Sequence, residues 1–174
     1  PVRITSRGAY PDMGLAMLNA TGRLLLVTNR LTPPQAELSA GAGFCDFPVM
    51  ARSGPDTAWA AWISFRDGHD TLQAARLKVK GPGLEPEKTW EVTGGTGARI
   101  LDPALAAAND GTAWLAWTGH QQAAGDDEIY AARWTGRRWT TEVQVSRDDE
   151  ALDTSPALAL DDRGQPWLAW TGSR

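Results

Sequence analysis

The chain has 174 residues, of which 42% are hydrophobic and 22% are charged, and its formal net charge is −4. This length and composition are enough for one hydrophobic core. The Lys and Arg residues are scattered, which argues against a nucleic-acid-binding groove, and no apolar run of about 18 residues is present that could span a membrane. Cys45 is the single cysteine, so an internal disulfide is excluded.

The most informative pattern is a repeat that occurs three times. A proline followed by small or apolar residues recurs at Pro48, Pro103 and Pro156, which are 55 and then 53 residues apart, and a Trp-x-Ala-Trp run follows each of them. Self-similarity at such a regular period predicts a repeat architecture.

The first 46 residues are interpreted as a degenerate copy of this repeat. Two apolar runs, 15–18 and 24–27, fit its first two strands, and Met13 takes the place of the proline. About one hairpin is therefore missing or rebuilt between Thr28 and Asp46. Ahead of these runs, residues 2–5 are similar to an outermost strand of the repeat.

The next two copies each contain four short apolar or alternating runs separated by turn residues. The runs lie at 48–51, 59–62, 72–77 and 90–92 in the first full copy, with a long turn at 78–89, and at 103–109, 114–117, 129–134 and 139–146 in the second. They predict four antiparallel strands in an up-and-down order. The proline is expected at the first residue of the innermost strand, where a missing N–H donor is tolerated.

The tryptophan pair of each copy predicts a sheet that is covered on both faces. Two residues at i and i+3 of a strand point to opposite faces, so a sheet with one wet face would leave one indole in water. Neighbouring blades of a propeller would cover both. Helices are not expected, because each of these runs is about six residues long and helices usually need about ten or more.

The sequence therefore predicts an all-β fold, specifically an incomplete β-propeller with antiparallel four-stranded blades. Two full and two partial blades are expected, at about 1–46 (degenerate), 47–101, 102–154 and 155–174 (half a blade). The last run would leave an apolar strand at a sheet edge. We expect another chain or a second copy of this one to complete the propeller; a small complete domain with an unusual last blade is the alternative.

Two stretches of the second full copy carry a resemblance to a known family. Pro103-Ala-Leu-Ala, followed by Trp114-Leu-Ala-Trp117 and by Ile129-Tyr-Ala-Ala-Arg-Trp134, resembles the repeats of bacterial sialidase-like (BNR-type) β-propellers. The resemblance covers 46–174 well and 1–45 loosely. It implies the propeller fold and a secreted or cell-surface location, and it leaves activity open, because such blades occur in glycosidases and in adhesins alike.

Sialidase motifs are matched only in part. The segments 109–114 and 162–167 are similar to the sialidase Asp box in their Asp or Asn, Gly and Trp, but its leading Ser is absent. We expect structural turns there, in which Asp or Asn bonds its own backbone and Gly adopts a positive φ. The opening arginine of sialidases has no counterpart near Tyr10, and no catalytic residue is assigned.

Polar loops at one end of the blades are the best candidates for a ligand-binding face, since function collects in loops on a rigid scaffold. The candidate ligand-binding residues are Arg66, Asp67, His69, Asp70, His120, Asp126 and Asp127.

Other interpretations of the polar residues compete with ligand binding. Asp46, Asp102 and Asp153 recur just before the innermost strand, where capping of backbone N–H groups is the structural explanation and Ca²⁺ binding the alternative. His69 and His120 occupy comparable loops, yet no third ligand is spaced to indicate zinc, and no cofactor is assigned. Arg137 and Arg138 are expected to stack on nearby Trp rings, with a Trp sugar platform as the alternative.

Two functions remain in contention. The first is a non-catalytic binding scaffold that presents its loop face to a protein or glycan. The second is part of a sialidase-like glycoside hydrolase whose other catalytic residues lie in blades outside this chain. A substrate-gating propeller of a peptidase ranks lower, because no Gly-x-Ser-x-Gly motif is present.

Overall fold

The computed structural model describes residues 44–80, 83–93, 99–120, 125–147, 149 and 151–173, together with Leu38 and two short strands at 16–18 and 24–26. The fold of this part is all-β and antiparallel, and it contains no helix that could cross a bilayer. The predicted features of 2–5 and of residues 28–37 and 39–43 lie outside the described residues. The strands are β1 (Ala16–Leu18), β2 (Leu24–Leu26), β3 (Phe44–Arg52), β4 (Thr57–Arg66), β5 (His69–Lys80), β6 (Gly83–Thr93), β7 (Arg99–Ala107), β8 (Ala113–His120), β9 (Asp127–Arg133), β10 (Val143–Gln144), β11 (Leu152–Leu160) and β12 (Pro166–Ser173).

Each copy of the repeat forms one sheet in sequence order. The first sheet is β3-β4-β5-β6, the second is β7-β8-β9-β10, and the third is the pair β11-β12. β1 and β2 pair separately with each other. The predicted up-and-down order of four antiparallel strands is therefore confirmed for the two full copies.

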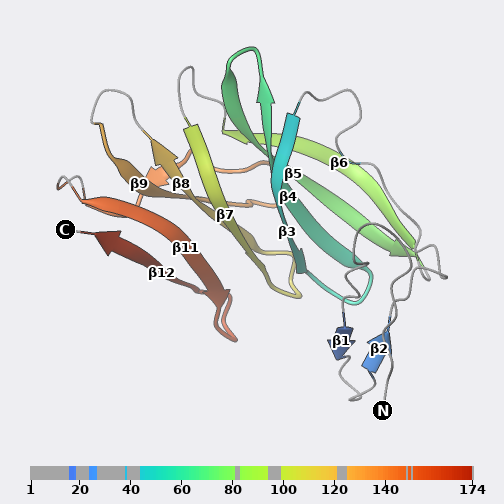
Figure 1. Ribbon diagram of the computed structural model, residues 1–174. Helices are drawn as coiled ribbons and strands as arrows, with labels where there is room; N and C mark the ends of the chain where they lie inside the picture. The colour runs from blue at the N-terminus through green and yellow to red at the C-terminus, as the bar shows by residue number, and fades with distance from the viewer. Residues whose placement is uncertain are drawn as a thin grey trace.

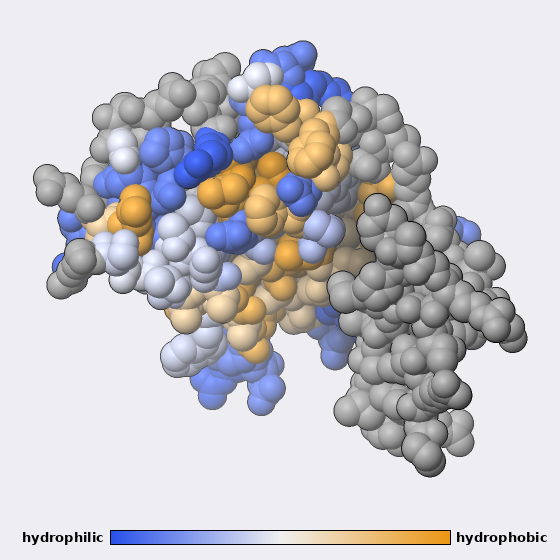
Figure 2. All heavy atoms as spheres, viewed as in Figure 1, coloured by the Kyte–Doolittle hydropathy of each residue, from blue (hydrophilic) through white to orange (hydrophobic). Residues whose placement is uncertain are grey.

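The first strands of the three sheets lie next to one another. β7 contacts β3 on one side and β11 on the other, and the sheets fan out from these strands (Figure 1). Small residues suit this crowded position, as in the Ala104 to Ala107 part of β7. As a result, the second sheet packs against the first sheet with one face and against the third sheet with the other. Figure 2 shows apolar residues gathered in the middle of the face seen in this view.

The tryptophan pair of β4 confirms the expectation that both faces are covered. Trp59 is 1% exposed and belongs to the cluster between the first and second sheets. Trp62 is 7% exposed and belongs to a separate cluster on the opposite face, with Ala60 and Leu77. In β8, Trp117 is buried on the side of the first sheet and Trp114 is half-buried.

Four indoles form the centre of the core between the first two sheets. The ring centroid of Trp59 lies 5.0 Å from that of Trp134 and 5.4 Å from that of Trp139, and Trp90 lies 4.6 Å from Trp134. Tilted and edge-on contacts of this kind add to the burial of apolar area. Trp139 is buried, so it is not the exposed sugar platform that was the alternative.

The cation–π contacts differ from those expected. Arg137 and Arg138 are exposed in the turn between Trp134 and Trp139. Within the described residues, the guanidinium over an indole belongs to Arg133, which lies 5.7 Å from the ring centroid of Trp114. The Lys88 ammonium group lies over the ring of Trp90. Arg133 and Trp114 are cross-strand partners in β8 and β9, a pairing set by strand register that their separation in the sequence does not indicate.

The recurring proline lies inside each first strand, which corrects the prediction that it begins the strand. β3, β7 and β11 all start before it, and each contains a bulge at the proline step. The preceding residues, Phe47, Asp102 and Ser155, have φ values of 51°, 49° and 55°. A bulge leaves one residue unpaired, so it accommodates a residue without an N–H donor as well as a strand start does.

Strands also extend into the long turn that was predicted at 78–89. β5 continues to Lys80, and β6 begins at Gly83 and pairs with it as far as Thr93. Oppositely charged residues face each other across this pair, with Lys80 Nζ 2.6 Å from a Glu85 carboxylate oxygen. The turn is therefore shorter than its prolines and glycines predicted. Proline is tolerated within β6 because β6 lies at the edge of its sheet.

The turns that resemble Asp boxes contain the expected positive-φ glycines, but the carboxylates that bond the backbone belong to neighbours of the residues matched to the motif. The Asp110 carboxylate accepts a hydrogen bond from the Thr112 N–H at 2.8 Å, and Gly111 has a φ of 87°. Gly164 has a φ of 75° in the corresponding turn, where the neighbouring Asp161 accepts from two backbone N–H groups. Because the Thr112 amide donates to this carboxylate, the pKa of Asp110 lies below its ordinary value of 3.8.

Candidate functional site

The candidate residues all lie at one end of the sheets, where β4 meets β5 and β8 meets β9, and we call this the loop end. They do not form one site. Arg66, Asp67 and His69 line a hollow on the first sheet, whereas His120 and Asp127 contact each other on the second sheet.

The hollow on the first sheet has a volume of about 450 Å³. It lies over the face that carries Trp62, away from the second sheet. Most of the side chains around it can donate or accept hydrogen bonds. The lining residues are Leu38, Trp62, Ser64, Arg66, Asp67, His69, Thr71, Gln73, Thr89 and Glu91.

A tight hairpin positions the three predicted residues of the hollow. Asp67 and Gly68 form its turn, with φ values of 53° and 90°, and Arg66 pairs with His69. An Asp-Gly pair with two positive φ values matches the right-handed twist of the flanking strands. The connection is therefore a two-residue turn, shorter than the polar loop predicted from the sequence, and it places Arg66 and His69 directly opposite each other.

Hydrogen bonds donated by side chains organise the inner part of the hollow. The Thr71 hydroxyl donates to the Ser64 carbonyl at 3.1 Å, and the Gln73 amide donates to the Thr71 hydroxyl at 3.1 Å. The indole N–H of Trp62 is buried and has no acceptor among the described residues. The hollow thus combines oriented hydroxyl and amide groups with one aromatic side chain.

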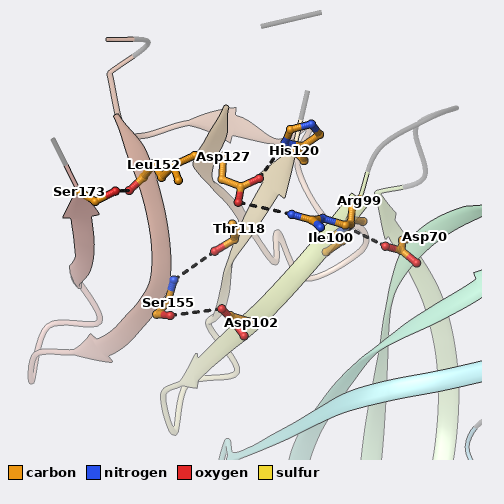
Figure 3. Close-up of polar contacts among 10 residues, drawn as sticks. All are labelled: Asp70, Arg99, Ile100, Asp102, Thr118, His120, Asp127, Leu152, Ser155 and Ser173. Carbon is orange, nitrogen blue, oxygen red and sulfur yellow. Dashed lines mark hydrogen bonds and ion pairs between the residues drawn. The ribbon is translucent and has the colours of Figure 1, made fainter. Parts of the chain in front are cut away.

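A cluster of three charged or titratable residues lies at the loop end of the second sheet. His120 Nδ1 is 2.9 Å from one oxygen of the Asp127 carboxylate, and the Arg99 guanidinium is 3.6 Å from the other (Figure 3). The register explains this contact, since Arg99 pairs with His120 and His120 pairs with Asp127 in one row across β7, β8 and β9. The hydrogen bond between the carboxylate and Nδ1 fixes the orientation of the imidazole ring.

Two further carboxylates flank Asp127 and are buried. Glu128 accepts a hydrogen bond from the Ser146 hydroxyl, and the same hydroxyl oxygen accepts the Ile129 N–H at 2.8 Å. Asp126 is 6% exposed, and its Oδ1 has no hydrogen-bond partner within the described part of the chain. Glu128 therefore ties β9 to the segment after β10.

Asp70 has a structural role that separates it from the other candidates. Its carboxylate accepts the Ile100 N–H at 2.9 Å and so joins β5 of the first sheet to β7 of the second (Figure 3). A similar link joins the second and third sheets, where the Ser155 N–H donates to the Thr118 hydroxyl at 3.2 Å.

The three recurring aspartates do not share one capping task, which corrects the expectation for them. Asp46 accepts the Phe47 N–H at 2.8 Å, Asp102 accepts the Ser155 hydroxyl at 3.3 Å, and Asp153 is buried within β11. The bulge register makes Asp102 equivalent to Phe47 and Ser155, and this equivalence could be found by aligning the copies on their prolines.

Sequence reasoning missed several residues of the site. Arg99 was not a candidate, and neither were Gln73 and Glu91; only the strand register, which shows that they share a row or a face with the candidates, could have revealed them. A second hollow of about 600 Å³ was also missed. The residues that line it are Val145, Ser146, Arg147, Asp149, Ala151, Asp153, Trp170 and Gly172.

Among the described residues, no group of three or more His, Cys, Asp or Glu side chains is placed to hold a metal ion. Comparison with known proteins gives no relative from which a role could be transferred: no family model matches the sequence, and no curated protein matches it.

Proposed function

We propose that the stacked sheets are blades of a β-propeller and that this chain is a non-catalytic binding part of it, which presents its loop end to a ligand. The observation that carries this proposal is the polar hollow of Arg66, His69 and Gln73, at the end of a sheet whose other face is fixed by the four-indole core. The adjacency of β3, β7 and β11 supports the propeller, because the innermost strands of its blades surround one axis.

The composition of the hollow favours a glycan over a protein as the ligand. Hydroxyl, amide and charged groups surround one aromatic residue, and their charges are of both signs. A ligand with many hydroxyl groups can satisfy such donors and acceptors, whereas protein interfaces have a larger apolar centre. The resemblance to sialidase-like repeats, in adhesins as well as enzymes, agrees with a glycan ligand and a secreted or cell-surface location.

A sialidase-like glycoside hydrolase is the second candidate, and it is favoured by the carboxylates at the loop end of the second sheet. Hydrolysis requires two carboxyl groups across a substrate-sized gap. Two of the three carboxylates already have partners, Asp127 with His120 and Arg99, and Glu128 with Ser146. Turnover of any glycoside that Asp126→Asn or Asp127→Asn abolishes would replace the binding proposal with this one.

The experiment that tests binding is a glycan array followed by calorimetric titration of the best ligand. His69→Ala and Gln73→Ala should each weaken binding about tenfold, which is the loss of one or two hydrogen bonds. Arg137→Ala is the matched control, because Arg137 is exposed in the turn between β9 and β10, at the end of the second sheet opposite the loop end. Binding that survives both hollow variants, or that Arg137→Ala weakens equally, would contradict the proposed site.

A further inference from the structure

We propose that β12 binds, along its free edge, an antiparallel hairpin of the same repeat, equivalent to β9 with β10. This inference rests on the proposed propeller and specifies how its third sheet is extended. Three separate features of the structure point to the same hairpin: an unpaired strand edge, a hollow beside Trp170, and an incompletely covered Trp114.

The first feature is the edge of β12. The equivalent strands β4 and β8 each pair on both sides, β4 with β3 and β5, and β8 with β7 and β9. β12 pairs with β11 alone among the strands that the structure describes, and it is the outer strand in Figure 1. The N–H and C=O groups along its outer edge are a ready template for another strand.

The second feature is a space that an aromatic side chain fills in the second sheet. Trp117 stacks on Tyr130 of β9, with ring centroids 6.3 Å apart and planes at 21°, and a Cβ on Gly119 would meet the Tyr130 ring at 2.8 Å. The same Trp-Thr-Gly sequence recurs in β12, where Trp170 and Gly172 line the hollow of about 600 Å³. Here a Cβ on Gly172 would meet an Asp153 carboxylate oxygen at 2.8 Å, so this side chain has to turn aside for an aromatic ring to occupy the equivalent place. Trp170 is 40% exposed, whereas Trp117 is 2% exposed.

The third feature is the cover over Trp114. Its equivalent in the first sheet, Trp59, is buried by Trp134 and Trp139, which flank the turn that leads from β9 to β10. Trp114 shares a side of β8 with Thr118, whose hydroxyl bonds to β11, so it faces the third sheet. There it is half-buried beneath Arg133. A Trp-turn-Trp hairpin beside β12 would cover it as Trp59 is covered.

The chemistry of the hairpin follows from these three positions. Its first strand needs a Tyr or Phe opposite Trp170, small residues in the middle, and a Trp on each side of its turn, as in the segment from Ile129 to Trp139. A second copy of this chain is not the source, because its β9 is paired with β8 over seven residues and Ile129 is fully buried. The partner is therefore a further repeat unit.

The test is a synthetic peptide with the sequence of residues 126–146, titrated into the protein and followed by hydrogen exchange. Saturable binding should slow exchange of the β12 amides at least about tenfold and leave β8 unchanged. A peptide with Tyr130→Ala should bind at least about tenfold more weakly, and one with Arg137→Ala, whose side chain lies in the exposed turn, should bind normally.

A covalent version keeps the proposal testable if the free peptide does not bind because ordering it costs too much. Residues 121–146 are appended after Ser173, which reproduces the spacing between β8 and β9, and β12 exchange should again slow. The proposal is overturned if β12 is not protected in either format. It is also overturned if β8 becomes protected, which indicates strand replacement, or if self-association of the free protein already protects β12. Glycan binding at the first sheet is measured separately, so failure here does not depend on it.

Discussion

Equivalent residues of the repeat have different environments, and tryptophan shows this most clearly. Trp59, Trp114 and Trp167 occupy the same position of successive copies, yet they are buried, half-buried and exposed. The i, i+3 spacing predicted which faces the indoles occupy. It could not predict how far each is covered, because the cover comes from the neighbouring sheet rather than from the strand itself.

This difference predicts unequal costs for the same substitution. Trp59→Ala should lower the free energy of unfolding by about 3–5 kcal/mol, because it empties the centre of the four-indole cluster. Trp167→Ala is the matched control and should change it by about 0.5 kcal/mol or less, since this side chain is 69% exposed. Urea denaturation measures both, and equal costs would contradict the assignment of Trp59 to the core.

The turn carboxylate Asp110 predicts a pH dependence of stability. Its pKa is lower in the folded chain than its ordinary value of 3.8, since the Thr112 N–H donates to it, so the unfolded chain binds the proton more readily. The contribution of the Asp110 carboxylate to stability is fully present above its ordinary pKa and is lost as the pH falls through its pKa in the folded chain. Carboxyl NMR titration should find a midpoint below 3.8, and Asp110→Asn should remove this part of the acid dependence.

At the scale of the elements, the bulge in each first strand explains what the recurring proline does. The sequence predicted a proline that begins a strand, because the missing N–H is tolerated there. A bulge satisfies the same requirement inside a strand, and it depends on a positive φ that no side-chain pattern marks; Phe, Asp and Ser occupy the three copies. The strand boundaries were therefore predicted less well than the strands.

Phe47 is the least suitable of these residues, because bulky side chains disfavour the left-handed region. Phe47→Asn should raise the free energy of unfolding by about 1 kcal/mol, since Asn tolerates this conformation and Phe47 is partly exposed. Thermal unfolding of the variant against Phe44→Asn, at an exposed position of the same strand, provides the comparison. A loss of stability specific to Phe47→Asn would show that the phenyl contacts outweigh the backbone strain.

At the scale of the whole molecule, side-chain bonds between sheets complement the indole core. Asp70→Ala leaves the Ile100 N–H without its acceptor and should cost about 1–2 kcal/mol, whereas Asp70→Asn keeps an acceptor and should cost less. Amide exchange at Ile100 reports the bond directly. Equal effects of the two substitutions, with no change in exchange at Ile100, would remove Asp70 from the link between sheets.

The repeat made the sheets and their stacking predictable, while the candidate site was predictable only in part. Polar residues at the loop end could be listed from the chain, but their grouping depends on which sheet face each side chain occupies. The tight Asp67-Gly68 turn places Arg66 and His69 at the hollow. The row from Arg99 to Asp127 is formed by strand register. Neither arrangement follows from sequence spacing.

The packing of one repeat sheet against the next is the claim on which the propeller, the hollow and the hairpin all depend. Nuclear Overhauser contacts between assigned indole protons measure it most directly. The ring centroids of Trp59 and Trp134 are 5.0 Å apart and those of Trp90 and Trp134 are 4.6 Å apart, so both pairs should give strong cross-peaks. Cross-peaks from Trp59 that are confined to its own sheet, with none to Trp134 or Trp139, would contradict the packing.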